Sequence, residues 1–213
     1  EARRRRLAGE HEAWQRGIAE RERPRDALTA EHLVGCIREA VGEDAIVVSE
    51  AVTNFHVVSQ HMRRTKAGTL FSSGGGSLGY NGGAALGVKL ARPEALVVSI
   101  CGDGSYLFAQ PSTVHWMSRA CRAPFLHVVL NNGGWRAPRQ AVLSVHPQGV
   151  AARARHIDID FPQPPDYAGI AAAAGGAHAE TVREVAGVKP ALERALQAIR
   201  EEGRSAVIDA HIQ

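Results

Sequence analysis

The stretch Cys101–Trp135, CGDGSYLFAQPSTVHWMSRACRAPFLHVVLNNGGW, determines the predicted fold. Apolar runs at residues 95–100 and 125–130 read as strands, and each ends in a polar turn that contains glycine. One helix-length segment separates them, so the stretch has the size of a βαβ unit, about 30 residues. The crossover in such a unit makes its two strands parallel, and their carboxyl ends then lie at the same edge of a sheet.

Polar side chains follow both strands. Asp103 comes after the first strand, in a Gly-Asp-Gly turn, and Asn131 and Asn132 come directly after the second. Open α/β sheets bind ligands at the carboxyl edge of their strands, so we expect these side chains to meet there. A carboxylate, two amides and tight glycine turns supply the hard oxygen ligands and backbone N–H groups that suit magnesium and a phosphate group.

The composition is that of an ordinary globular protein and excludes several functional classes. The 213 residues are 45% hydrophobic and 22% charged, which is enough to bury a core. Net charge is +3, of which the first 26 residues supply +2 (eight Arg against six acidic residues), so no nucleic-acid-binding surface is predicted. No apolar run approaches the roughly 20 residues that span a membrane, and no signal peptide is visible. Three separated cysteines indicate neither a disulfide framework nor a zinc site, and we expect a cytoplasmic protein.

The remaining elements predict a three-layer α/β fold, an open parallel sheet with helices on both faces. Residues 1–27 read as a charged helix with too little apolar surface for a core, so we interpret them as a linker or the tail of a preceding domain. The main domain is then 28–213. Thr29 should cap its first helix, which Gly42 ends. Further predicted strands are 45–49, 68–71 and 205–212, and further predicted helices are 54–63, 84–90, 166–175 and 190–203.

Three segments have a less regular pattern. Residues 136–165 contain prolines and glycines without clear periodicity and are predicted to form a long loop. Residues 181–184 (TVRE) read as a capping box at the start of a helix. Thr53 and Asn54 follow the strand at 45–49, where either residue could cap the next helix or contact a ligand.

A glycine-rich segment at residues 72–91, SSGGGSLGYNGGAALGVKLA, precedes the Gly-Asp-Gly turn. Such a run is typical of backbone that approaches a ligand closely. Gly74, Gly76 and Gly79 match the G-x-G-x-x-G fingerprint, so an NAD-binding Rossmann dehydrogenase is an alternative. Against it, the strand before the segment is short and weak. Asp103, the acid nearest the expected ribose ligand, lies inside a glycine turn of its own.

The Gly-Asp-Gly turn, the 26 residues after it and the Asn131-Asn132 pair together resemble the diphosphate-and-magnesium motif of thiamine diphosphate (ThDP) enzymes. The glycine-rich segment resembles the one that precedes this motif in the acetohydroxyacid synthase and benzoylformate decarboxylase branch. The resemblance covers residues 28–213 and implies the C-terminal ThDP-binding domain. Thr53 and Asn54 depart from the Gln-His that the synthase branch often carries at this place.

The resemblance also implies which residues hold the metal. The side chains of Asp103 and Asn132 and the carbonyl of Gly134 would ligate Mg²⁺. Two diphosphate oxygens and a water would complete an octahedron. Asn131 would brace the turn.

For the cofactor, the resemblance implies contacts along both glycine turns. The backbone N–H groups of Gly104 and Ser105 would donate to the phosphates. The backbone of Gly76 and Leu78 would hold the aminopyrimidine, with Leu78 as the apolar wedge that bends the cofactor. The implied cofactor-binding residues are Thr53, Asn54, Gly76, Ser77, Leu78, Asp103, Gly104, Ser105, Asn132, Gly134 and Trp135.

The implied activity is that of an acetolactate synthase-like enzyme, which cleaves or forms a C–C bond next to a carbonyl by 2-oxo acid decarboxylation, carboligation or lyase chemistry. In the family, a glutamate of the N-terminal pyrimidine-binding domain activates the cofactor, and that domain has no counterpart in this sequence. Glu50, on the diphosphate side, is a poor candidate for this role. We therefore expect a second chain or domain to complete the site in a homo- or hetero-oligomer (dimer or tetramer), and no activity without it. Besides the Rossmann reading, a non-catalytic subunit with the ThDP fold is an alternative.

Overall fold

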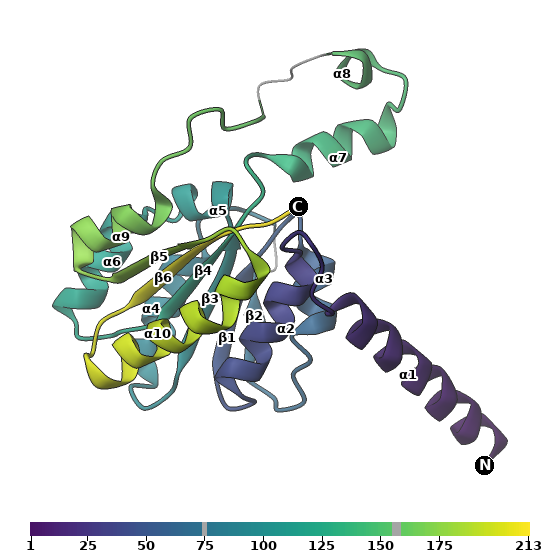
Figure 1. The fold of residues 1–213 in the computed structure, drawn as a ribbon, viewed down its shortest axis with the longest axis horizontal. Coiled ribbons are helices and arrows are strands. Elements are labelled where there is room, and N and C mark those ends of the chain that lie inside the picture. Colours follow the sequence, from purple (N-terminus) through teal and green to yellow (C-terminus); the bar gives the residue numbers. More distant parts are fainter. Residues whose placement is uncertain (74–75, 155–158) are drawn as a thin grey trace.

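The computed structural model describes residues 1–73, 76–154 and 159–213, and its centre is a six-stranded parallel sheet (Figure 1). The strand order is β2-β1-β3-β4-β6-β5, and every neighbouring pair is parallel. The strands are β1 (Ile46–Glu50), β2 (Leu70–Ser72), β3 (Val97–Gly102), β4 (Leu126–Asn131), β5 (His178–Val182) and β6 (Ala206–His211). Strands β1, β3, β4 and β6 lie inside the sheet and are almost entirely buried, as their continuous apolar runs predict.

Helices cover both faces of the sheet, so the predicted three-layer α/β fold is confirmed. The helices are α1 (Ala2–Arg21), α2 (Ala30–Val41), α3 (Phe55–His61), α4 (Asn81–Ala91), α5 (Asp103–Phe108), α6 (Pro111–Ala120), α7 (Arg136–Val145), α8 (Val150–Arg153), α9 (Tyr167–Gly175) and α10 (Val188–Glu201). As predicted, Thr29 accepts the N–H of His32 at the start of α2, and Gly42 follows its last residue. In the described part of the chain, no helix is long and apolar enough to cross a membrane.

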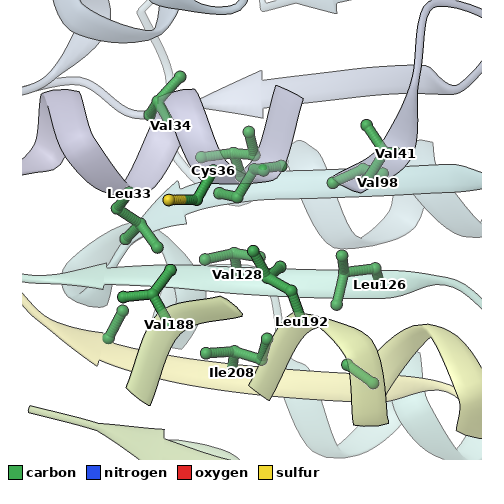
Figure 2. Packing of buried hydrophobic residues seen from close by; sticks show 14 of the residues in the cluster. Leu33, Val34, Cys36, Val41, Val98, Leu126, Val128, Val188, Leu192 and Ile208 are labelled. Atoms are coloured by element: carbon green, nitrogen blue, oxygen red, sulfur yellow. The ribbon is translucent and has the colours of Figure 1, made fainter. Parts of the chain in front are cut away.

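The larger hydrophobic cluster lies between the sheet and helices α2, α3 and α10 (Figure 2). Leu33 and Cys36 on α2, and Val188 and Leu192 on α10, belong to this cluster together with Val128 on the central strand β4. The opposite face is covered by α4, α5, α6 and α9, where two smaller clusters form around Tyr106, Phe125 and Tyr167. Because both faces of the central strands are packed, the loops at their carboxyl ends are held in place.

Two segments extend away from this core (Figure 1). Most of α1 is exposed, but its last turns are attached: Ile18 is buried, and the carboxylate of Glu22 binds the guanidinium of Arg38 at 2.6 and 2.8 Å and Nδ1 of His61 at 2.9 Å. At the carboxyl edge of the sheet, α7 and α8 leave the core, and none of their residues is buried.

Three predictions from the sequence were wrong. The single helix expected between β3 and β4 is two helices, because Gln110 adopts a left-handed conformation (φ 54°) between α5 and α6. The predicted capping box at 181–184 instead overlaps β5, an edge strand in which exposed and half-buried residues alternate. Part of the predicted loop 136–165 is helical: it contains α7 and α8, although none of their residues is buried.

Candidate functional site

A cavity of about 330 Å³ opens at the carboxyl ends of β1, β3 and β4. It is lined by the turns that follow these strands, by the glycine-rich segment and by the first turns of α7. Of the residues predicted to bind cofactor, all but the exposed Ser77 line this cavity. The lining residues are Ala51, Val52, Thr53, Asn54, Gly76, Leu78, Gly102, Asp103, Gly104, Ser105, Asn132, Gly134, Trp135, Arg136, Ala137, Pro138 and Ala141.

Asp103 joins the two turns of the motif. Its Oδ1 accepts the N–H of Gly104 at 2.8 Å, and its Oδ2 accepts the N–H of Gly134 at 2.9 Å. The side chain is only 2% exposed, and burial raises the pKa of its carboxyl, although the N–H groups of the turns offset part of this effect. A buried carboxylate with spare lone pairs is favourable where a cation binds beside it.

The asparagine pair forms the other half of the site. Asn131 braces the turn as expected: its Oδ1 accepts the N–H of Gly133 at 3.1 Å, and its Nδ2 donates to Asp209 on β6 at 2.9 Å. Asn132, in contrast, lines the cavity, and its Oδ1 is buried without a hydrogen-bond donor among the described residues. A buried amide oxygen left unpaired in this way is costly unless a ligand satisfies it.

The sequence did not reveal a short segment, residues 159–161, that holds this turn from the outside. The N–H of Trp135 donates to the carbonyl of Ile159 at 2.7 Å, and the N–H of Phe161 donates to the carbonyl of Gly133 at 2.9 Å, around an antiparallel bridge between residues 134 and 160. Gly134 is required here, because it has φ 154° and a Cβ would stand 2.2 Å from the Ile159 carbonyl oxygen. No local pattern predicts such a contact, since its partners are about 25 residues apart.

The side chain of Arg136 lies beside this bridge and binds two groups of the chain itself. Its Nε donates to the carbonyl of Asn132 at 3.2 Å, and one guanidinium nitrogen pairs with Asp160 at 2.6 Å. The pair is partly exposed, with 39% and 51% of the two side chains accessible. Arg136 therefore connects the turn at residues 131–134 to the segment 159–161, while it also lines the cavity.

The glycine-rich segment forms the opposite wall of the cavity. Gly76 (φ 66°) and Gly79 (φ 97°) have left-handed backbones, and Leu78 lies between them with its side chain half-buried at the cavity. A Cβ on Gly79 would stand 2.7 Å from the carbonyl oxygen of Phe108, so the segment passes close to α5. Gly74, the first glycine of the predicted fingerprint, lies outside the described residues.

Comparison with known proteins identifies this arrangement. Residues 51–210 match the family model "Thiamine pyrophosphate enzyme, C-terminal TPP binding domain". The chain belongs to this family. The match includes the Gly-Asp-Gly turn, the asparagine pair and the glycine-rich segment, which are the features on which the resemblance was based.

Two of the similar proteins have the names of the enzymes that the glycine-rich segment resembles. The chain is 31% identical over 112 residues to a benzoylformate decarboxylase of Pseudomonas aeruginosa, which covers 53% of the chain and 21% of that protein. It is 32% identical over 114 residues to an acetolactate synthase of Mycobacterium leprae, covering 53% of the chain and 18% of that protein. The chain thus spans about a fifth of the length of these relatives. The fold resembles a ThDP-dependent 4-hydroxybenzoylformate decarboxylase of Rhodococcus jostii, with a TM-score of 0.76, 23% identity, and coverage of 89% of the chain and 33% of that structure.

The sheet of this ThDP-binding domain also differs from a Rossmann sheet. Its order, 2-1-3-4-6-5, is not the Rossmann order 3-2-1-4-5-6. The strand before the glycine-rich segment, β2, is a three-residue, fully exposed edge strand, whereas the fingerprint requires a strand that leads directly into a helix at the centre of the fold. The family match and this topology together rule against the NAD alternative.

Thr53 and Asn54 lie at the cavity, at the carboxyl end of β1. Asn54 occupies the N-cap position of α3, but within the part of the chain that the structure describes its side chain makes no cap hydrogen bond. The prediction that the Asn54 side chain caps α3 is therefore not supported, and its amide can contact a ligand instead.

The residues present fit a magnesium ion and a diphosphate. Asp103, Asn132 and Gly134 offer a carboxylate, an amide and a carbonyl oxygen, which are the hard ligands that Mg²⁺ prefers. The Gly134 carbonyl accepts the N–H of Arg136 at 3.0 Å and keeps a second lone pair. In the ranges 1–73, 76–154 and 159–213, no group of three His, Cys, Asp or Glu side chains forms an alternative metal site.

Proposed function

We propose that this chain forms the Mg-ThDP-binding half of an enzyme that cleaves or forms a C–C bond next to a carbonyl, with a 2-oxo acid or a related carbonyl compound as substrate. The observation that carries the proposal is the pair formed by Asp103 and the unpaired Oδ1 of Asn132 at the edge of the cavity. The family match supports the cofactor, and the decarboxylase and synthase relatives support the reaction class.

The chain's own residues would bind and orient the cofactor's diphosphate end. Asp103, Asn132 and the Gly134 carbonyl would hold Mg²⁺, and the backbone N–H of Ser105, in the first turn of α5, would face the phosphates. The N–H of Gly104, which the resemblance also implied as a phosphate donor, instead donates to Oδ1 of Asp103. When bound, ThDP supplies the nucleophilic carbon and the electron sink for the reaction. Gly76 and Leu78 would hold its aminopyrimidine from the opposite wall.

Trp135 completes the cavity on the side of α5. Its ring lies within 2.2 Å of the position that a Cβ on Gly104 would take, so only glycine fits beneath it. Phe108 and Phe161 pack edge-on against the Trp135 ring, with centroid distances of 5.5 and 5.2 Å. These contacts give the diphosphate end of the cavity a rigid apolar wall, which would exclude water from the phosphates.

The proton chemistry of the proposed reaction requires a partner. The two buried carboxylates in and beside the cavity already have roles: Asp103 accepts the N–H of Gly134 in the turn at residues 131–134 (the metal turn), and both oxygens of Glu50 accept backbone N–H groups. We therefore assign the activating acid to a pyrimidine-binding domain, on another chain or elsewhere in the same polypeptide. The length of the relatives supports this assignment, because each is about five times as long as the segment that matches this chain.

Two measurements test the proposal. Calorimetric titration of the full chain with Mg-ThDP and with NAD should show binding of Mg-ThDP alone. Release of CO₂ from 2-oxo acids, or formation of a carboligation product, should appear only when the pyrimidine-binding half is present. Binding of NAD in place of Mg-ThDP would refute the assignment, and binding of Mg-ThDP without activity in the completed assembly would indicate a non-catalytic subunit.

A further inference from the structure

Glu50, the last residue of β1, is a buried carboxylate with both oxygens bound to the glycine-rich segment. The residue is 3% exposed. Its Oε1 accepts the N–H of Gly79 at 2.7 Å, and its Oε2 accepts the N–H of Asn81 at 2.8 Å. On its other side, the backbone carbonyl of Glu50 accepts the hydroxyl of Ser105 at 3.1 Å. One residue therefore joins the end of β1, the glycine-rich segment and the first turn of α5.

The physical chemistry of these bonds makes them strong and directional. Asn81 is the first residue of α4, an eleven-residue helix whose first N–H groups have no partner within the helix. A carboxylate at this end is stabilised by the helix dipole, and hydrogen bonds to an ionised acceptor are stronger than neutral ones. Because Glu50 is buried, losing either bond would leave a charge without compensation, so the geometry of both bonds is tightly set.

Asn81 is fixed to the sheet by a second route. Its Nδ2 donates to the hydroxyl of Ser99 on β3 at 3.0 Å and contacts Nε2 of His127 on β4 at 2.9 Å. The start of α4 is thus tied to three neighbouring strands. Gly76 and Leu78, which line the cavity, lie next to this anchor: among the described residues, the bond from Gly79 to Glu50 ties this part of the glycine-rich segment to the end of β1.

We propose that Glu50 is a positioning residue that sets the separation between the two walls of the cavity. One wall is the backbone of Gly76 and Leu78, and the other is the metal turn together with the start of α5. This inference rests on the proposed function, in which ThDP contacts both walls at once, whereas an isolated diphosphate contacts only the metal side. Since both carboxylate oxygens accept backbone N–H groups, we assign Glu50 a positioning role and no role in proton transfer.

The experiment compares two ligands that differ in how much of the cavity they reach. Mg-ThDP and Mg-pyrophosphate are titrated calorimetrically into the full chain and into the Glu50→Gln variant. Gln is isosteric but has one acceptor oxygen, so one of the two N–H bonds is lost. The dissociation constant for Mg-ThDP should rise about tenfold. The constant for Mg-pyrophosphate should rise by no more than about twofold, because the metal side keeps its contacts.

Controls separate positioning from general loss of stability. Val47→Ala removes buried apolar volume from the same strand, but its side chain belongs to the hydrophobic cluster that contains no residue of the glycine-rich segment, so it should leave the ratio of the two dissociation constants unchanged. If Glu50→Gln does not fold, Glu50→Asp replaces it: the charge remains, but the shorter side chain cannot reach both donors, and the ratio should again rise.

The outcomes are distinct. A selective loss of Mg-ThDP affinity supports the inference. An unchanged ratio in a folded Glu50 variant overturns the inference while the proposed function stands. Failure of the wild-type chain to bind Mg-ThDP at all overturns the proposed function itself and the inference with it.

Discussion

Acidification from pH 7 to pH 5 should destabilise this fold through His115, a buried histidine of α6. The side chain is 1% exposed, and its ring packs against those of Phe125 and Tyr106, with centroid distances of 5.5 and 6.2 Å. Burial lowers its pKa from 6.5 to about 4, since the charged imidazolium would lose its hydration. Burial also lowers the pKa of the neighbouring His127, which acts in the same direction.

The sign and size of the effect follow from proton linkage. The unfolded chain binds a proton at His115 below pH 6.5, whereas the folded chain does so only near pH 4, so protons favour the unfolded state between these values. The contribution of neutral His115 to the stability is therefore present above pH 6.5 and is lost as the pH falls toward 4. At pH 5 the loss from His115 amounts to about 2 kcal/mol in the free energy of unfolding.

Urea denaturation at pH 7 and pH 5 measures this loss directly. The His115→Gln variant, which cannot titrate, should lose about 2 kcal/mol less than the wild type between the two pH values. His56→Gln is the matched control, because His56 lies exposed on α3 and its replacement should leave the pH dependence unchanged. Equal losses in wild type and His115→Gln would refute the reasoning.

Three further substitutions test the packing and the site. Gly134→Ala should weaken Mg-ThDP binding in a calorimetric titration, because its Cβ would collide with the Ile159 carbonyl oxygen and displace the metal turn; unchanged affinity would contradict this. Leu192→Ala should lower the free energy of unfolding in urea by about 2–5 kcal/mol, since this 2%-exposed side chain fills the core between α10 and the sheet. Glu22→Gln should cost about 1–3 kcal/mol in the same assay, because the Arg38 guanidinium would lose its buried carboxylate. A loss below a few tenths would show that α1 is attached by other contacts.

The sequence predicted the structure best for the strands that are buried on both faces of the sheet. Strands β3 and β4 were placed to within two residues, because strands buried on both faces read as continuous apolar runs between glycine turns. Their spacing implied parallel strands, which brings Asp103 and Asn132 to one cavity although 29 positions separate them in the sequence.

The sequence predicted poorly where tertiary contacts decide the structure. Strand β5 lies at the edge of the sheet, where its partly exposed residues give no apolar run, and the cap-like pattern at 181–184 was misleading. The bonds from Glu50 to Gly79 and Asn81, and the bridge between residues 134 and 160, join segments 24 or more positions apart. No local periodicity encodes such contacts, although they hold both walls of the site.

The assignment of residues 1–27 to a linker or the tail of a preceding domain remains a prediction. Helix α1 extends away from the core, which is compatible with that assignment (Figure 1). Its last turns nevertheless belong to the packed structure, since Ile18 is buried and Glu22 binds Arg38 and His61. We propose that the packed domain begins near Ile18 rather than at residue 28. Removal of residues 1–27 should then lower the stability of the rest, whereas removal of residues 1–14 should not.

The central claim is that Asp103 and Asn132 hold the metal to which the cofactor binds. Electron paramagnetic resonance of Mn²⁺, used as a substitute for Mg²⁺, reports the metal's environment when ThDP is added to the full chain. The account predicts a ThDP-dependent bound signal in the wild type and in Glu193→Gln, a control at an exposed carboxylate of α10, and loss of that signal in Asp103→Ala and in Asn132→Ala. A bound signal that persists in both of the latter variants would place the metal elsewhere and contradict the account.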